Sequence, residues 1–560
     1  MVVQLNTEVL DRIFREVLLE RPAGRKRERW RVFATEDEDE FQSHLCKAQD
    51  IYNKKLLKTV SRTCKAWRRS VLSMISSRTL GLNGQELDGW VAAVASLRPF
   101  SKLVMLEVLV HCGEKPFFPD NKKKKPAKKK LTRSKDDGAD SFQAACQELA
   151  TKMPNLVYLS VNISGDDTNF APPTWRMIDM FEAFARAGIS AAEGPRRGIR
   201  GIEVDNIGVR TLKQSLPYFA DTLLRLKIGK NVKLTSDLSQ TLGQALSTLS
   251  HLSLQGKYGT LNVCNLNVQP LLSRAPSLQS LDLYYAKDLS YKAVAEALGE
   301  RSTEAPLLEV DIIKCDGPED DLAPLITRHA STLRQLSVTN IDSNPVLLTA
   351  LSLCTQLEDL SFYYAPSTTS LLQLTTLGEL KTLTTGCSSG SAAVGWDGPA
   401  IQAMGRGMSA LQKLSVSQFV GEVAWAMIPR EMTSVRHLVV PFRSVAQISE
   451  LAQSGADSIH TLEIFSTGSV FSSDDATLAP LEGFKALAKM RSLTVLSVCC
   501  SHFEVTDIAI APFLSGAPSL KEFELSGWKE KVASGDISIS LLQRLQRRGI
   551  TISPSLQSQP

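Results

Sequence analysis

The stretch Leu278-Gln-Ser-Leu281-Asp-Leu283 decides the fold, because its pattern, apolar-x-x-apolar-x-apolar, returns along nearly the whole chain. If the first apolar residue of each copy is taken as its mark, the marks are Leu103, Leu156, Ile199, Leu223, Leu249, Leu278, Leu307, Leu333, Leu357, Leu380, Leu411, Val435, Ile459, Leu493 and Leu520. From Ile199 onward the marks fall 23 to 34 residues apart. A repeat of this length is one small unit that buries its apolar face only by stacking on its neighbours.

The phrase and its period resemble those of a leucine-rich repeat, in which each unit is a short strand followed by a returning helix or loop. The residues at the fourth and sixth places, such as Leu281 and Leu283, point to one face of the strand. Each such side chain contributes about 1.5–3 kcal/mol when stacking buries it. We therefore expect an α/β leucine-rich-repeat solenoid with a curved parallel sheet and convex helices, of which residues 291–298 and 322–330 are the clearest.

Composition indicates an ordered protein, since 43% of the 560 residues are hydrophobic and 22% are charged. The net charge of +5 is small against 64 basic and 59 acidic residues, so it says little about partners. No apolar run reaches the roughly 18–20 residues that a membrane span needs, and the first residues lack a signal-peptide pattern. We expect a nuclear or cytoplasmic protein that binds no membrane and keeps its ten scattered cysteines reduced.

The first eighty residues contain two segments with apolar residues at helical spacing. One opens at Leu5 and carries Val9, Leu10, Ile13 and Phe14. The other carries Leu57, Val60, Cys64 and Trp67 on one face. A few short helices cannot bury enough surface to be stable alone, so this unit needs either a partner surface or the first repeat to pack against.

These two segments resemble an F-box, whose first helix reads Leu-Pro-x-Glu-(Leu/Val)-Leu-x-x-Ile-Phe and whose later helix reads Val-Cys-Lys-x-Trp-Arg. The matching residues are Glu8, Val9, Leu10, Ile13, Phe14, Cys64, Lys65, Trp67 and Arg68. Asn6 stands where the family has proline, and a charged insert of about residues 20–54, similar to those of fungal members, separates the halves. The resemblance implies a Skp-type adaptor of a cullin–RING ubiquitin ligase as partner, bound through Leu5, Val9, Leu10, Ile13, Phe14, Cys64 and Trp67. The alternative is that these segments form a helical cap on the repeats.

The resulting domain organisation is an F-box-like domain over residues 1–80 and a repeat array over residues 81–560. A lysine-rich tract interrupts the array, and we expect a disordered loop over about residues 115–140. The tract suits nuclear import or simply a solvated loop. Nucleic-acid contact is less favoured because no aromatic residues interleave the lysines. The import residues would be Lys122, Lys123, Lys124, Lys125, Lys128, Lys129 and Lys130.

The third, fifth and seventh places of the phrase point away from the core, onto the concave face. In the central copies these places are mainly acidic with two tyrosines, interrupted by Arg225, Lys227 and His251. His251 and His437 are interpreted as surface histidines. We predict a site for a basic segment of a target protein, although solvent-facing strand positions must be polar in any case. Its residues would be Asp282, Tyr284, Glu309, Asp311, Asp359 and Tyr363.

The sequence has no P-loop, no His-Glu-x-x-His and no cysteine pairs with zinc spacing. We therefore expect a non-catalytic protein without cofactor or metal. The favoured function is the substrate-recognition subunit of an SCF-type ubiquitin ligase. The alternatives are a repeat scaffold or inhibitor without a ubiquitin role, and a nuclear nucleic-acid adaptor that uses the lysine tract.

Overall fold

The computed structural model describes residues 77–83, 105–111, 137–164, 174–190, 198–255, 264–300, 305–386, 396–416, 426–465, 479–499, 507–525 and 537–554, except for gaps of one to three residues inside some ranges. The chain forms two compact units. The first comprises Met1–Ala305 with Lys314–Asp316, and the second comprises Pro306–Ile313 with Gly317–Pro560. The segments that resemble an F-box lie outside the described residues.

Among its described residues, the first unit contains seven parallel strands, each paired with the next along the chain. They are β1 (Ser77–Asn83), β2 (Met105–His111), β3 (Tyr158–Ser164), β4 (Gly201–Asp205), β5 (Arg225–Ile228), β6 (His251–Gln255) and β7 (Ser280–Tyr284). Parallel neighbours need a returning connection, which in this unit is supplied by α7 (Asp137–Thr151), α8 (Thr174–Ser190), α9 (Val209–Ser215), η3 (Leu216–Phe219), α10 (Ser236–Ala245), α11 (Asn265–Ser273) and α12 (Tyr291–Gly299).

The second unit repeats this plan, and the part of it that the structure describes has ten parallel strands in sequential order. They are β8 (Glu309–Ile313), β9 (Gln335–Val338), β10 (Asp359–Phe362), β11 (Thr382–Thr385), β12 (Lys413–Val416), β13 (His437–Pro441), β14 (Thr461–Phe465), β15 (Val495–Cys499), β16 (Glu522–Leu525) and β17 (Thr551–Pro554). The returns are η4 (Glu319–Leu322), α13 (Ala323–His329), α14 (Pro345–Leu351), α15 (Thr368–Gln373), η5 (Leu374–Thr376), α16 (Gly398–Gly407), α17 (Met427–Glu431), α18 (Val445–Gln453), α19 (Ala479–Leu487), α20 (Asp507–Gly516) and α22 (Ile539–Arg547).

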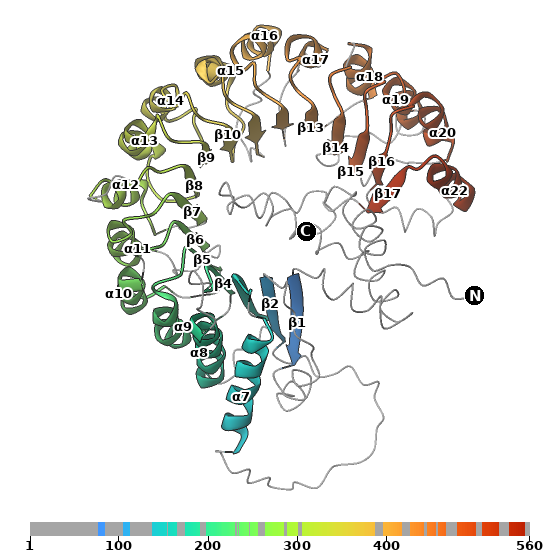
Figure 1. The fold of residues 1–560 in the computed structure, drawn as a ribbon. Coiled ribbons are helices and arrows are strands. Elements are labelled where there is room, and N and C mark those ends of the chain that lie inside the picture. Colours follow the sequence, from blue (N-terminus) through green and yellow to red (C-terminus); the bar gives the residue numbers. More distant parts are fainter. Residues whose placement is uncertain are drawn as a thin grey trace, which may run out of the picture. The chain divides into compact units, whose positions relative to one another are not determined.

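Within each unit the strands line the inner side and the helices the outer side (Figure 1). A strand begins two residues after every mark of the repeated phrase, as β7 does after Leu278. Leu281 and Leu283 are buried on the helix side of β7, as the fourth and sixth places require. The α/β leucine-rich-repeat solenoid is therefore confirmed, because the phrase places the same apolar residues in the same layer in each turn.

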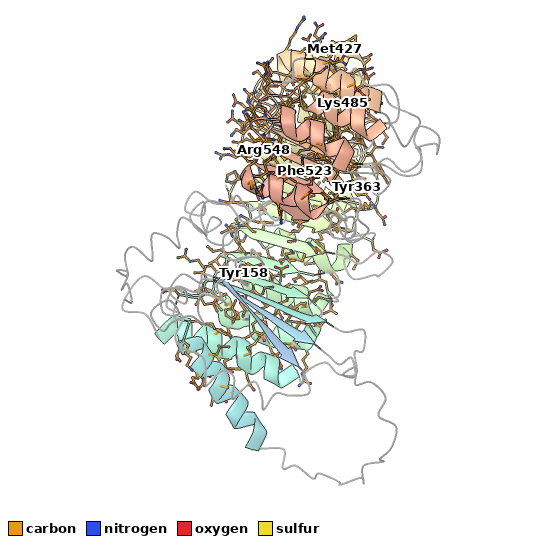
Figure 2. All side chains as sticks on the ribbon, turned by 90° about the vertical axis from the view of Figure 1, so that its right-hand side faces the viewer. Tyr158, Tyr363, Met427, Lys485, Phe523 and Arg548 are labelled. Atoms are coloured by element: carbon orange, nitrogen blue, oxygen red, sulfur yellow. The ribbon has the colours of Figure 1, made fainter. Side chains whose placement is uncertain are left out.

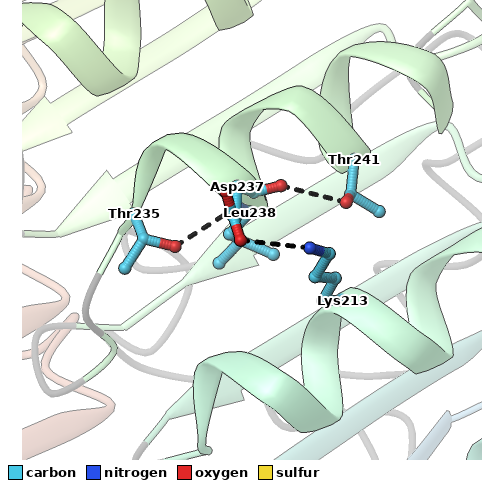
Figure 3. Close-up of polar contacts among 5 residues, drawn as sticks. All are labelled: Lys213, Thr235, Asp237, Leu238 and Thr241. Carbon is cyan, nitrogen blue, oxygen red and sulfur yellow. Dashed lines mark hydrogen bonds and ion pairs between the residues drawn. The ribbon is translucent and has the colours of Figure 1, made fainter.

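Neighbouring helices are also joined by polar contacts on the outer side. In Figure 3, Lys213 of α9 reaches across to Asp237 of α10, with 3.2 Å between Nζ and Oδ2. Two further hydrogen bonds are local to α10. The backbone amide of Leu238 donates to Thr235 Oγ1 at 3.3 Å, and Thr241 Oγ1 donates to the carbonyl of Asp237 at 3.0 Å. Because the ion pair is exposed, it contributes at most about 1 kcal/mol, and the apolar layer beneath holds the helices together.

Two boundaries differ from those expected. Strand β1 crosses the predicted domain boundary at residue 80 and lacks the phrase, because Arg78 stands where the fourth apolar residue would be if Ile75 were the mark. Helix α7 begins at Asp137, inside the loop expected over residues 115–140. Its buried residues Ala145, Cys146 and Leu149 anchor the helix, and extending an anchored helix upstream costs little. At the other end, helix α22 is followed by strand β17.

Candidate functional site

The inner face of each sheet carries the candidate binding residues, because alternate strand residues point away from the helices. In the first unit one row of this face runs through Glu203, Lys227, Ser253 and Asp282, which are in register on β4 to β7. We call these four residues the central row of the first unit. Parallel strands lie about 4.8 Å apart, so side chains on neighbouring strands of the row are close enough to interact.

Lys227 forms an ion pair with Glu203, its neighbour in this row. Its Nζ lies 2.8 Å from Glu203 Oε1, and both side chains are largely buried. The hydroxyl of Tyr158 on β3 (Figure 2) donates to Glu203 Oε2 at 2.9 Å. Gly201 makes this reach possible, since a Cβ there would lie 2.4 Å from Cδ2 of the Tyr158 ring. Glu203 thus has both oxygens engaged by its own sheet.

Asp282 is a predicted target-binding residue that lies deeper than expected. Only 9% of it is exposed, and its Oδ2 accepts a hydrogen bond from Ser253 Oγ at 2.7 Å. Burial raises the pKa of the Asp282 carboxyl, while the Ser253 hydrogen bond and the charge of Lys227 act in the opposite direction. Asp282 therefore belongs to an internal polar network, and the expectation of a fully solvent-facing carboxylate is corrected.

His251 is not the surface histidine that its outward position suggested. It is 5% exposed, and its Nδ1 lies 2.7 Å from Ser250 Oγ. Burial, and then the charge of Arg225, lower its pKa from 6.5 to about 3. The imidazole is therefore neutral throughout the physiological range.

This depressed pKa predicts a pH-dependent stability. The unfolded chain takes up a proton near pH 6.5 and the folded chain only near pH 3, so stability present above pH 6.5 is lost as the pH falls through this window. The loss amounts to about 2 kcal/mol at pH 5 relative to pH 7.5. In urea titrations at the two pH values, His251→Gln should lose this much less stability than the wild type. His460→Gln, at an exposed position, is the control, and equal pH dependence of all three proteins would contradict the prediction.

The remaining target-binding predictions lie on or directly after strands and are half-buried. Tyr284 ends β7 in the first unit. In the second unit Glu309 and Asp359 are both in register with Gln335 of β9, and Asp311 with Ser337. Tyr363 follows β10 and packs edge-on against Tyr364, with ring centroids 5.1 Å apart. The six predicted residues thus divide into Asp282 and Tyr284 in one unit and the other four in the other unit.

Sequence reasoning overlooked a second acidic group, although its own rule could have found it. The fifth places after Ile459, Leu493 and Leu520 are Glu463, Ser497 and Glu524, which lie in register on β14, β15 and β16. His437 Nε2 lies 3.0 Å from Glu463 Oε1. These residues were not predicted because the target-binding site was sought in the central copies of the repeat, and they lie in later copies.

The predicted adaptor-binding residues Leu5, Val9, Leu10, Ile13, Phe14, Cys64 and Trp67 lie outside the described residues, and so do all seven import lysines.

In the described part of the chain, no helix is long and apolar enough to cross a membrane. The described residues also include no group of three or more His, Cys, Asp or Glu side chains that could hold a metal ion. Burial raises the pKa of the Cys354 thiol to about 12, so this cysteine is protonated and a poor nucleophile at neutral pH.

Comparison with known proteins finds no matching family model and no matching curated protein. Among solved structures, the chain is similar to one in the crystal structure of the Rad7 and Elc1 complex in yeast, at 15% identity and a TM-score of 0.33, covering 99% of this chain and 98% of that one. It is similar to one in the mouse RP105/MD-1 complex at 13% identity and a TM-score of 0.29, covering 86% and 64%. The leucine-rich repeat-containing protein LegL7 from Legionella pneumophila gives 14% identity and a TM-score of 0.26, covering 64% and 97%. The fold assignment rests on the strands and their register.

Proposed function

We propose that this protein is the target-binding subunit of an SCF-type ubiquitin ligase. The observation that carries the proposal is the joint match of Glu8-Val9-Leu10 with Ile13-Phe14 and of Cys64-Lys65 with Trp67-Arg68, directly upstream of a repeat solenoid. Either short match alone would be weak. The F-box resemblance implies this order, in which the two matching segments come first and an array of the target-binding type follows.

The repeat array is suited to the receptor half of this function. Within each unit, parallel strands hold the polar side chains of the inner face in register, and solenoids use such faces for binding. In the second unit Glu309 and Asp311 lie on β8 and Asp359 on β10, and the aromatic residue Tyr363 directly follows β10. Such a surface suits a basic segment of a target protein, because carboxylates bind Arg and Lys while tyrosine supplies contact area.

In this proposal the chain contributes no catalytic group. It holds the target near the ubiquitin-transferring enzymes, so that its effect on the reaction is one of proximity. The lysine tract is proposed to direct part of the protein to the nucleus, with the rest in the cytoplasm.

The test is affinity purification of the tagged full-length chain, followed by mass spectrometry, from separate nuclear and cytoplasmic fractions. We expect a Skp-type adaptor and a cullin together with a target protein in both fractions. Recovery of a target without any adaptor would favour the scaffold reading and reject the ligase proposal. Absence from the nuclear fraction would reject the import role of Lys122–Lys125 and Lys128–Lys130.

A further inference from the structure

The last three repeats of the second unit carry exposed basic side chains where each helix ends and the next strand follows. They are Lys489 and Arg491 between α19 and β15, Lys521 between α20 and β16, and Arg547 and Arg548 at the end of α22, before β17. We call these five residues the basic edge. Because the strands are parallel and the helices return between them, the three connections lie at the same edge of the sheet.

Two hydrogen bonds hold these connections side by side. The backbone amide of Lys521 donates to the carbonyl of Thr494 at 2.8 Å. Arg548, labelled in Figure 2, donates from Nη2 to the carbonyl of Ala517 at 3.2 Å. Neighbouring strands lie about 4.8 Å apart and packed helices about 8–10 Å apart, so the basic edge is a line of charge roughly 10–20 Å long.

No carboxylate of the described chain neutralises this edge. The connections over residues 488–494, 516–521 and 546–550 contain no aspartate or glutamate. Within the described part of the chain, the side chains of Lys489, Arg491, Lys521 and Arg547 have no ion pair and no hydrogen bond. Arg548 uses one of its five N–H donors on the Ala517 carbonyl. The basic edge is therefore open to an anionic partner.

An earlier repeat of the same unit is built differently at this edge. Lys381 and Lys521 each stand one residue after the mark of their repeat. The corresponding residue of the repeat before Lys381 is Glu358, and Lys381 Nζ lies 2.7 Å from its Oε2. For Lys521 that residue is Thr494, which carries no charge. The repeat has room for a neutralising carboxylate at this place, and the last repeats lack it.

The dipoles of the helices do not account for the whole edge. The negative end of a helix dipole stabilises a cation in the last turn, and the effect falls off within that turn. This explains Arg547, the last residue of α22. Arg491 and Lys521, however, lie more than a turn of residues beyond the helix ends at Leu487 and Gly516. Their charge is left for another partner.

We infer that the basic edge binds an extended acidic segment of a partner protein. Side chains on one face of an extended segment repeat about every 6.6 Å, which lies within the range of spacings between neighbouring strands and neighbouring helices. A segment of about four to six residues therefore reaches across all three connections. Guanidinium and ammonium groups bind carboxylates through charge-assisted hydrogen bonds. This surface is separate from the inner face, and the inference does not depend on the ubiquitin-ligase proposal.

Other anionic partners match the basic edge less well. Sites for single-stranded nucleic acid stack bases on aromatic residues, and the three connections contain none. Duplex DNA is commonly held by about 6–10 phosphate contacts, more than this edge supplies. Surfaces that bind membranes add exposed apolar side chains to the cations. The exposed large apolar residues of the described chain all lie in other repeats, and they are Tyr218, Val346, Leu353 and Leu372.

The test measures fluorescence anisotropy of a labelled hexaglutamate peptide with the full-length protein. All proteins compared carry glutamine in place of the seven import lysines, so that the peptide cannot bind there. We expect Lys489→Gln with Arg491→Gln and Lys521→Gln to raise Kd about tenfold, the combined effect of losing three exposed ion pairs.

The matched control removes the same charge from exposed helix positions of the first unit. It combines Arg210→Gln and Lys213→Gln on α9 with Lys292→Gln on α12, and it should change Kd less than about twofold. Equal Kd values for the two triple variants would overturn the inference. A variant that keeps the charges, Lys489→Arg with Arg491→Lys and Lys521→Arg, should bind like the parent protein. If it loses as much affinity as the glutamine variant, the charge of the edge does not bind the peptide.

Two further measurements locate the peptide and separate it from nucleic acid. On the wild-type protein, hexaglutamate that carries a photo-crosslinker should attach within residues 488–494, 516–521 or 546–550, and attachment only elsewhere would overturn the inference without any variant. A short DNA duplex is the rival ligand, and the triple glutamine variant should weaken the peptide more than the duplex. A larger loss for the duplex would assign the edge to nucleic acid instead. The adaptor takes no part in these measurements, so their failure leaves the ligase proposal standing.

Discussion

Replacing Ile13 and Phe14 together by aspartate is expected to remove the Skp-type adaptor from the purified protein. The F-box resemblance implies that both side chains are buried against the adaptor, and burying each contributes about 1.5–3 kcal/mol. Losing both contributions costs at least about 3 kcal/mol, a loss of affinity on the order of a hundredfold. The two carboxylates add a desolvation penalty. Co-purification of the two tagged proteins, quantified against the wild type, is the measurement.

The matched control puts the same change on apolar residues that are already exposed. Val346 on α14 is 57% exposed and Leu353 just beyond it is 52% exposed, so Val346→Asp with Leu353→Asp should leave the adaptor bound. If both double variants retain the adaptor, residues 13 and 14 do not dock it. A helical cap on the repeats would then be the better interpretation of the first eighty residues.

Replacing Trp396 by alanine should destabilise the second unit by about 3–5 kcal/mol, the range found for large aromatic residues in cores. Trp396 is 1% exposed and precedes α16, and its Nε1 donates a long hydrogen bond of 3.4 Å to the carbonyl of Pro366 in the preceding repeat. The change removes packing from two adjacent repeats and leaves that carbonyl without its donor. Since neighbouring repeats stabilise each other, the effect should spread along the array.

Urea unfolding followed by circular dichroism measures this loss. Leu372→Ala on α15 is the control, because Leu372 is 40% exposed and its replacement should change stability by less than about 0.5 kcal/mol. Similar unfolding midpoints for the Trp396 and Leu372 variants would show that Trp396 does not link the repeats.

The fold could be predicted from the sequence because each repeat of the solenoid requires apolar residues at the same places. The mark, the fourth place and the sixth place of a copy must all be apolar to build one layer, as Leu278, Leu281 and Leu283 do. Where a repeat departs from the phrase, the phrase does not predict its strand, as at β1, whose fourth place is Arg78. The start of α7 was missed because helix propagation from a buried anchor leaves little trace in the sequence.

The candidate sites could be predicted only as positions. Strand alternation correctly assigned Asp282 and His251 to the inner face, and the same rule finds Glu463, Ser497 and Glu524. It could not show that Asp282 and His251 are buried, because their covering comes from residues on strands more than twenty positions away in the chain.

The sequence by itself determined the repeat, the direction of the side chains and, through the F-box resemblance, the proposed partner, because these depend on spacing within a short stretch. Only the tertiary structure decided which charges meet. Glu203 lies 2.8 Å from Lys227 of the next repeat, and Glu463 lies 3.0 Å from His437 of the repeat before it. The physical reason is that parallel strands bring residues from different repeats to within about 4.8 Å of each other, and that pairing sets their charge and burial.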